Sequence, residues 1–334
     1  MELSATNEDE RLVSNNSINI SSHGISYSFG GLTVVQLRYI FAFFCGLILL
    51  VGFVGNLFML LVLIEGFQNS SSSTSSPIST MTSTLMINIT ISDLIFLLYN
   101  VTVLLFTFLY EDWEMGAAVC VSSQSFSMWT MFCSFYSMVA TSILRYMAVL
   151  HPTCSFSTNT FQRFLLCLLM WLMGFTVSIP NWMHQGVLVI DDARYCMLLM
   201  TPRQTYLYFV LFGGMAFFPF VLLLVLCYAR IVQSLWFRRM VVVHSSVNIQ
   251  LNKKATVMIL TVLAVFILMW IPYSVLIYLS ATHSLPQTSS AFVASSVSTV
   301  LAYSNCSVSP ILCFSLSDQF QAGLRKLLCR RDSQ

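Results

Sequence analysis

The amino-acid sequence predicts an all-α membrane protein: a seven-transmembrane helix bundle with a short amphipathic helix after the seventh span. The 334-residue chain is 57% hydrophobic and only 8% charged, whereas soluble domains are typically about 25% charged. Apolar runs of about 20 residues or more, enough to cross a bilayer as a helix, occur at 37–64, 85–110, 117–150, 164–183, 205–229, 255–280 and 290–316. In lipid the backbone groups of each segment must pair internally, so these runs predict helices rather than an open sheet.

The domain organisation follows from these runs. We expect residues 1–36 to form an extracellular, glycosylated N-terminus, residues 37–316 the bundle, and residues 317–334 a cytoplasmic amphipathic helix and tail. The final segment, SDQFQAGLRKLLCRR, combines apolar and basic residues in a pattern typical of a helix that lies on a membrane surface. Cys329 within this segment is a candidate for palmitoylation.

The third apolar run carries its first charge at Arg145. At about 1.5 Å per residue, a helix from Cys120 to Arg145 is roughly 38 Å long, which exceeds the hydrocarbon thickness of about 30 Å. This run therefore places Cys120 at one membrane face and Arg145 at the other.

A second cysteine on the face of Cys120 predicts a disulfide. Cys196 lies in QGVLVIDDARYCM, after the fourth run, and two cysteines that face an oxidising compartment favour a bridge. Two free thiols are the alternative. Five further cysteines lie within apolar runs, where cysteine is typical of a small core residue: Cys45, Cys133, Cys167, Cys227 and Cys306.

The distribution of charge predicts the orientation of the spans. With the amino end outside, 11 of 15 basic residues face the cytoplasm, as the positive-inside rule requires. These are Arg145, Arg163, Arg230, Arg238, Arg239, Lys253, Lys254, Arg325, Lys326, Arg330 and Arg331. The glycosylation sequons at Asn15 and Asn19 are usable only in that orientation. We therefore predict a multi-pass plasma-membrane protein with an extracellular N-terminus and a cytoplasmic C-terminus.

Two residues inside apolar runs suggest function. Asp93 lies well within the second run, and a carboxylate in the membrane is costly enough to be a functional candidate by default. A structural hydrogen-bond hub is the alternative. Pro272, in FILMWIPY of the sixth run, removes a backbone hydrogen bond and predicts a hinge.

Motifs along the chain resemble, in order and spacing, those of the rhodopsin-like (class A) G protein-coupled receptors. They are Gly55-Asn56, ISDL around Asp93, WxxG at Trp113, LRYMAVLHP around Arg145, Trp171, Pro219, FxxxWxP from Phe266 to Pro272, and SPILC from Ser309 to Cys313. The resemblance covers residues 37–329. LAYSNCSVSP and LRYMAVLHP are most similar to the galanin-receptor neighbourhood of the peptide receptors.

The resemblance implies roles for individual residues, with Cys120–Cys196 as the extracellular disulfide. It places a G-protein switch at Leu144, Arg145, Tyr146 and Tyr228, and a toggle and hinge at Phe266, Trp270, Pro272, Ser309, Pro310 and Cys313. It places a ligand pocket at Ser127, Met128, Met131, Trp270, Tyr273 and Tyr303. The one cofactor implied is an allosteric sodium ion at Asp93, Ser134, Asn305 and Ser309, and a hard cation does prefer several oxygen donors.

The chain departs from the family pattern at its switches. Leu144 replaces the acidic residue before Arg145, and SPILC lacks both the asparagine and the tyrosine of NPxxY. Tyr228 lies nine residues after Pro219 rather than the usual eight, and Met269 replaces the cysteine of CWxP. A free arginine would raise basal activity, whereas the missing tyrosine would weaken the active state, and both outcomes stay open.

The expected function is that of a receptor that transmits an extracellular signal, from a peptide or an unidentified ligand, to heterotrimeric G proteins. Arrestin and the lipid bilayer are further expected partners, and nucleic acid is not. Ser127 replaces the aspartate of amine receptors, and acidic outer loops favour a basic peptide, unless these loops simply avoid bases. The alternatives are a transporter or channel, which would show repeats or several intramembrane charges, and a signalling-deficient or constitutively active receptor-like protein. An enzyme is not expected, because the sequence shows no paired carboxylates and no metal-binding motif.

Overall fold

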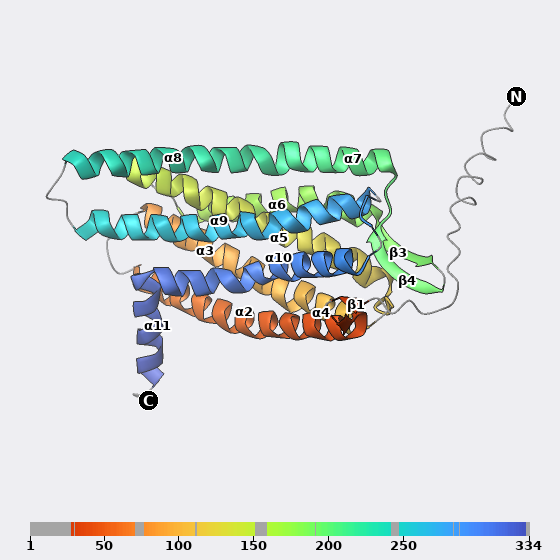
Figure 1. The fold of residues 1–334 in the computed structure, drawn as a ribbon. Coiled ribbons are helices and arrows are strands. Elements are labelled where there is room, and N and C mark those ends of the chain that lie inside the picture. The colour runs from red at the N-terminus through yellow and green to blue at the C-terminus, as the bar shows by residue number, and fades with distance from the viewer. Residues whose placement is uncertain are drawn as a thin grey trace, which may run out of the picture.

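The computed structural model describes residues 28–29, 31–70, 77–110, 112–150, 159–190, 192–241, 247–282, 284–286 and 288–331. It confirms the predicted fold class, because seven helical segments are long and apolar enough to cross a membrane. Figure 1 shows these segments side by side with their axes roughly parallel. The two β-hairpins lie at one end of the bundle and the short helix α11 lies at the other.

Five spans are single helices, and two contain a π-helix between two α-helices. The first four spans are formed by α2 (Val34–Ser70), by α3 (Pro77–Ile95) with the π-helix η1 (Phe96–Val101) and α4 (Thr102–Leu109), by α5 (Gly116–Leu150) and by α6 (Thr160–His184). The last three are formed by α7 (Pro202–Leu211) with the π-helix η2 (Phe212–Phe217) and α8 (Phe218–Val241), by α9 (Val247–Ala281) and by α10 (Ser289–Leu316). The helix α11 (Asp318–Arg331) follows directly.

Side chains fix the starts of two of these helices. Asn159 and Gln162 form a reciprocal capping box at the start of α6, and Thr201 and Gln204 form another before α7. Each box satisfies backbone N–H groups that have no partner within the helix. Pro202 follows Thr201 at the first helical position, where its fixed φ suits the helix and its missing N–H costs nothing.

Three of the apolar runs that the sequence indicates are shorter than the helices that contain them. The first run, 37–64, lies within α2, which continues to Ser70. The fourth run, 164–183, lies within α6, which begins at Thr160, and the sixth run, 255–280, lies within α9, which begins at Val247. Helical pairing within the segment satisfies backbone groups near a membrane better than an irregular chain does.

Two short hairpins were not predicted. Strands β1 (Ser28–Phe29) and β2 (Leu32–Thr33) pair antiparallel, as do β3 (Gln185–Ile190) and β4 (Ala193–Leu198). In the second hairpin Val187 pairs with Cys196. Asp192 adopts φ 64° in its turn, a left-handed conformation that aspartate tolerates better than most residues.

Helix α5 is the centre of the bundle. In its most apolar stretch 61% of residues are buried, against 6% in the span Pro202–Ser234. Asn88 of α3 links α5 to α6, because its Nδ2 donates to Ser137 Oγ at 2.9 Å and its Oδ1 accepts from Trp171 Nε1 at 2.9 Å. This pairing inside the bundle joins three spans through one side chain.

The short helix α11 lies at one end of the bundle, roughly at a right angle to the spans (Figure 1), and docks on α2. Lys326 forms an ion pair with Glu65 at 2.9 Å, and Phe320 is buried. A Cβ on Gly323 would lie 2.6 Å from Val62 Cγ1, so the glycine allows the close approach. The predicted amphipathic helix after the seventh span is confirmed.

Close packing of α5 on α6 yields the first prediction. A Cβ on Gly174 would lie 2.7 Å from the backbone oxygen of Trp129, an atom that cannot move without shifting the helix. We expect Gly174→Ala to destabilise the detergent-purified protein by about 1–3 kcal/mol, the usual cost of overpacking. The same change at Gly46, where a Cβ meets nothing within 4 Å, should leave the melting temperature unchanged or higher. Equal melting temperatures for the two variants would contradict this account of the interface.

Candidate functional site

The β3–β4 hairpin is fixed over one end of the bundle. The disulfide Cys120–Cys196 joins β4 to the start of α5 and confirms the predicted pairing. Trp113 reinforces the attachment, since its backbone N–H donates to the carbonyl oxygen of Arg194 at 3.0 Å and its Nε1 donates to the carbonyl oxygen of Gly116 at 2.8 Å.

An ion pair completes the attachment of the hairpin. Asp112 accepts hydrogen bonds from the backbone N–H of Arg194 and from its Nε at 3.0 Å. These two bonds, the backbone one first, lower the pKa of Asp112, so its carboxylate stays ionised at neutral pH. The loop before α5 and strand β4 therefore hold each other in place.

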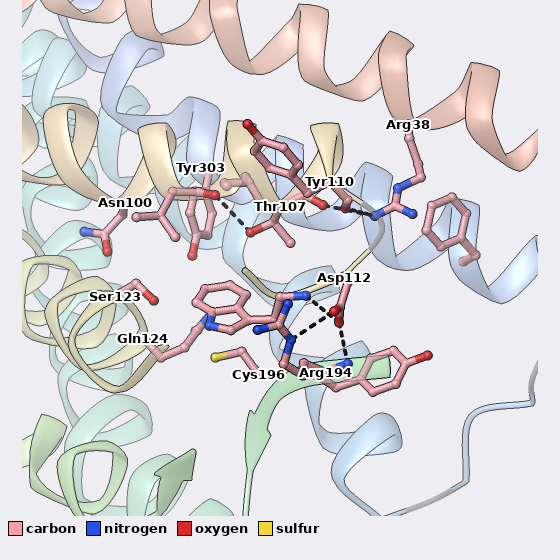
Figure 2. Close-up of a pocket in the computed structure, with 15 residues that line it drawn as sticks. Arg38, Asn100, Thr107, Tyr110, Asp112, Ser123, Gln124, Arg194, Cys196 and Tyr303 are labelled. Atoms are coloured by element: carbon pink, nitrogen blue, oxygen red, sulfur yellow. Dashed lines mark hydrogen bonds and ion pairs between the residues drawn. The ribbon is translucent and has the colours of Figure 1, made fainter. Parts of the chain in front are cut away.

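A cavity of about 430 Å³ opens beside this hairpin (Figure 2). It lies between α2, η1, α4, α5, β4 and α10, and its lining includes Arg38, Asn100, Trp113, Gln124, Phe292 and Tyr303. Arg38 donates to the carbonyl oxygens of Thr107, at 3.3 Å, and Tyr110, which are at the end of α4. This guanidinium thereby pairs carbonyls that the helix end leaves free.

Most of the six residues predicted to form the ligand pocket do not line this cavity. Tyr303 alone among them lines it, and Ser127 Oγ lies 3.4 Å from Tyr303 Oη. The ring centroid of Tyr273 lies 5.5 Å from that of Trp270. Met131 and Trp270 instead line a smaller inner cavity, and Met128 is half-buried. Their contact with a ligand stays a prediction.

An aromatic cluster lies between the cavity beside the hairpin, called the outer cavity below, and the smaller inner cavity. Trp270 lies 6.0 Å from Phe266 and 6.4 Å from Phe96, between ring centroids, and Phe96 lies 4.8 Å from Tyr303. The Trp270 Nε1 is buried without a hydrogen-bond partner among the described residues. Rotation of this indole would therefore break ring contacts but no hydrogen bond to the described part of the chain.

The predicted sodium ligands meet only in part. Ser134 Oγ donates to Asp93 Oδ1 at 3.2 Å, and both residues line the inner cavity of about 20 Å³ together with Asn305. Asn305 Nδ2 donates to Met269 Sδ at 3.6 Å, whereas Ser309 Oγ donates to the Asn305 carbonyl at 3.1 Å. A carboxylate, a hydroxyl and an amide oxygen suit a hard cation, but Ser309 is not in the lining.

At the far end of α5, Arg145 is held without an ion pair among the described residues, and its buried Nε has no hydrogen-bond partner there. Leu144 is buried in an apolar cluster with Met81 and Leu85. A hydrophobic contact thus occupies the position where the family pattern has an acid.

The other residues of the predicted switch and hinge lie around this end. Tyr228 Oη lies 2.9 Å from Ser142 Oγ, and Tyr146 is half-buried. Pro272 and Pro310 lie within α9 and α10. Cys313 is buried with Met59 and Met258, where a tyrosine would not fit without rearrangement of that cluster.

Glycosylation and palmitoylation stay predictions. Asn15 and Asn19 lie outside the described residues. Cys329 is an exposed free thiol on α11, and its palmitoylation stays a prediction.

Sequence reasoning missed several polar residues of the outer cavity. Arg38, Asp112 and Arg194 belong to no recognisable motif. Asn100 belongs to none of the family motifs either, although a buried amide in a membrane span is itself a signal. Asn100 belongs to the π-helix η1, which no sequence pattern predicted.

A seven-span bundle with a cavity under a disulfide-bonded hairpin has the architecture of a membrane receptor. The family model described as 7 transmembrane receptor (rhodopsin family) matches residues 39–312. The chain therefore belongs to the rhodopsin family of seven-transmembrane receptors, as its motifs suggested, and is a multi-pass membrane protein.

The proteins to which this chain is similar include galanin receptors, as predicted. Galanin receptor 2a of Danio rerio is 26% identical over 84% of this chain and 76% of its own length. Galanin receptor type 2 of Mus musculus is 29% identical over 85% of this chain and 74% of its own length. The Allatostatin-A receptor of Bombyx mori is 29% identical over 85% of this chain and 78% of its own length.

Proposed function

We propose that this receptor binds a peptide at its hairpin end and signals to heterotrimeric G proteins at its Arg145 end. The observation that carries the proposal is the cavity of about 430 Å³ beside the β3–β4 hairpin, on a chain related to the galanin and Allatostatin-A receptors. The hairpin end is then extracellular and α11 cytoplasmic, in the plasma membrane, which the positive-inside distribution supports. The protein acts as a receptor rather than an enzyme, with arrestin as a second cytoplasmic partner.

The charges of the cavity bear on the kind of peptide. Arg38, Arg194 and Asp112 line it, and the one carboxylate is paired with Arg194. The acidic character of the outer loops therefore does not extend into the cavity. Long-range attraction by these loops would raise the rate at which a basic peptide meets the receptor, but it does not determine the contacts that the bound peptide makes in the cavity.

A peptide-library screen tests the proposed function. Cells that express the full chain are exposed to the library, with readouts from several G-protein sensors and from arrestin recruitment. We expect at least one peptide to activate a G protein, and the response to be lost with Cys196→Ser, which frees the hairpin from α5. Activation only by small molecules or ions, with no peptide response, would contradict the peptide assignment.

The environment of Leu144 predicts measurable basal signalling. Because Arg145 has no acidic partner among the described residues, we expect Leu144→Asp to supply one and to lower ligand-free signalling at matched surface expression. A gain of about 1.4 kcal/mol for the resting state would lower a small active fraction tenfold.

A matched variant separates charge from packing at this position. Leu144→Asn has nearly the same shape as Leu144→Asp and removes the same apolar contacts with Met81 and Leu85, but it adds no charge. The aspartate variant should therefore signal less than the asparagine variant. If the two have equal basal signalling, the missing acid does not set the resting balance.

The inner cavity predicts a sodium dependence of agonist affinity. We propose that Asp93, Ser134 and Asn305 hold a sodium ion that stabilises the resting state, since binding at two coupled sites is reciprocal. Replacing sodium with a large organic cation at equal ionic strength should raise agonist affinity about fivefold or more, and Asp93→Asn should abolish this effect. Ser309→Ala should preserve it, because Ser309 bonds its own helix. Wild-type affinity that ignores sodium would refute the site.

A further inference from the structure

Asn100 is a buried polar side chain that the bundle leaves without a partner. It is 2% exposed, and among the described residues neither its Nδ2 nor its Oδ1 makes a hydrogen bond. Nearly all buried polar atoms in native proteins are paired, so an amide that lacks both a donor and an acceptor partner calls for an explanation.

A second asparagine on the same span shows what a structural role looks like here. Asn88 is 5% exposed, and its amide is paired on both sides, by Ser137 at 2.9 Å and by Trp171 at 2.9 Å. The bundle thus supplies partners to the asparagine that holds helices together. Asn100 differs in having none among the described residues, although it is as deeply buried.

The position of Asn100 supplies the second observation. It lines the outer cavity of about 430 Å³ together with Ser123, Gln124 and Tyr303 (Figure 2). It also belongs to the π-helix η1 (Phe96–Val101), and π-helical turns within α-helices are frequent at functional sites. The unpaired amide therefore lies in the wall of the space that a ligand would enter.

Two arginines of the cavity already make contacts within the protein. The Arg38 guanidinium donates to neutral backbone carbonyl oxygens at the end of α4, and Arg194 is paired with Asp112. Asn100 is a neutral amide, so it offers no counter-ion of its own to a ligand carboxylate or ammonium that it contacts, and burying an unpaired charge is costly. The chemistry offered at this wall is one uncharged donor next to one uncharged acceptor.

We propose that Asn100 is a specificity-determining residue that binds a primary carboxamide of the ligand. The ligand NH₂ donates to Asn100 Oδ1, while the ligand C=O accepts from Asn100 Nδ2. A carboxylate lacks the donor and an ammonium lacks the acceptor. The carboxamide belongs to a peptide C-terminal amide or to an Asn or Gln side chain, and this inference rests on the proposed function of the outer cavity.

Fragment binding to the purified full-length receptor tests the site without a known ligand. Phenylacetamide and phenylacetate share a ring and differ only in carboxamide against carboxylate. We expect millimolar phenylacetamide to raise the melting temperature of the wild-type receptor, phenylacetate to have less effect, and Asn100→Leu to remove the difference. Equal effects of the two fragments on the wild type, or a difference that persists in Asn100→Leu, would overturn the proposal.

The stability of the ligand-free receptor separates this role from a structural one. Because Asn100→Leu removes an unpaired buried amide, we expect it to keep or raise the melting temperature, whereas Asn88→Leu should lower it by breaking two hydrogen bonds. A loss of stability in Asn100→Leu as large as that in Asn88→Leu would show that Asn100 holds the bundle together and would overturn the proposal.

Peptide activity then identifies the source of the carboxamide. Each active peptide is prepared with a C-terminal amide or acid, and with its Asn and Gln residues changed to Asp and Glu. One of these changes should reduce potency about tenfold in the wild type, as expected for two lost hydrogen bonds, and much less in Asn100→Leu. Active peptides that are insensitive to every change overturn the carboxamide assignment but not the receptor function. If fragments discriminate as expected and no peptide is active, the peptide assignment alone fails.

Discussion

The exclusion of water from the bundle is the constraint on which the rest of this structure depends. Helix α5 is the most deeply buried of the spans although it is rich in hydroxyl groups, and several of these groups are paired along its own backbone: Ser137 with the Cys133 carbonyl, Thr141 with that of Ser137 and Ser142 with that of Met138. Without water as an alternative partner, such pairing is what makes a polar helix tolerable in the centre. Spans at the periphery need no such device, because lipid meets their apolar faces.

Against this background three groups that have no hydrogen-bond partner among the described residues stand out by position. Asn100 lies beside the outer cavity, Trp270 Nε1 lies between the two cavities, and Arg145 Nε lies at the opposite end. Paired groups such as Asn88 fix the helices, whereas these three groups lie where a ligand or a rearrangement could supply the partner.

Hydropathy and a few motifs were enough to predict the spans, the Cys120–Cys196 bridge and the final helix. Each of these depends on composition over many residues or on strongly restrictive chemistry. The sequence did not predict the π-helix η1, since its widened turn depends on packing against α2 and α5, and consequently it did not indicate that Asn100 lines a cavity. It also placed Ser309 among the sodium ligands, because a motif fixes a residue's helix but not the partner that its hydroxyl chooses.

The tether at Cys120 has a mechanical consequence. Helix α5 is joined to β4 by the disulfide at Cys120 and is enclosed by neighbouring helices along its length, so we expect it to be the most rigidly held span. The span Pro202–Ser234 is enclosed least, with 6% of its most apolar stretch buried. A displacement of that span would exchange one lipid contact for another at little cost, since lipid tails are as apolar as the side chains they touch. We therefore expect movement of the spans to concentrate at the edge of the bundle, while α5 keeps its position.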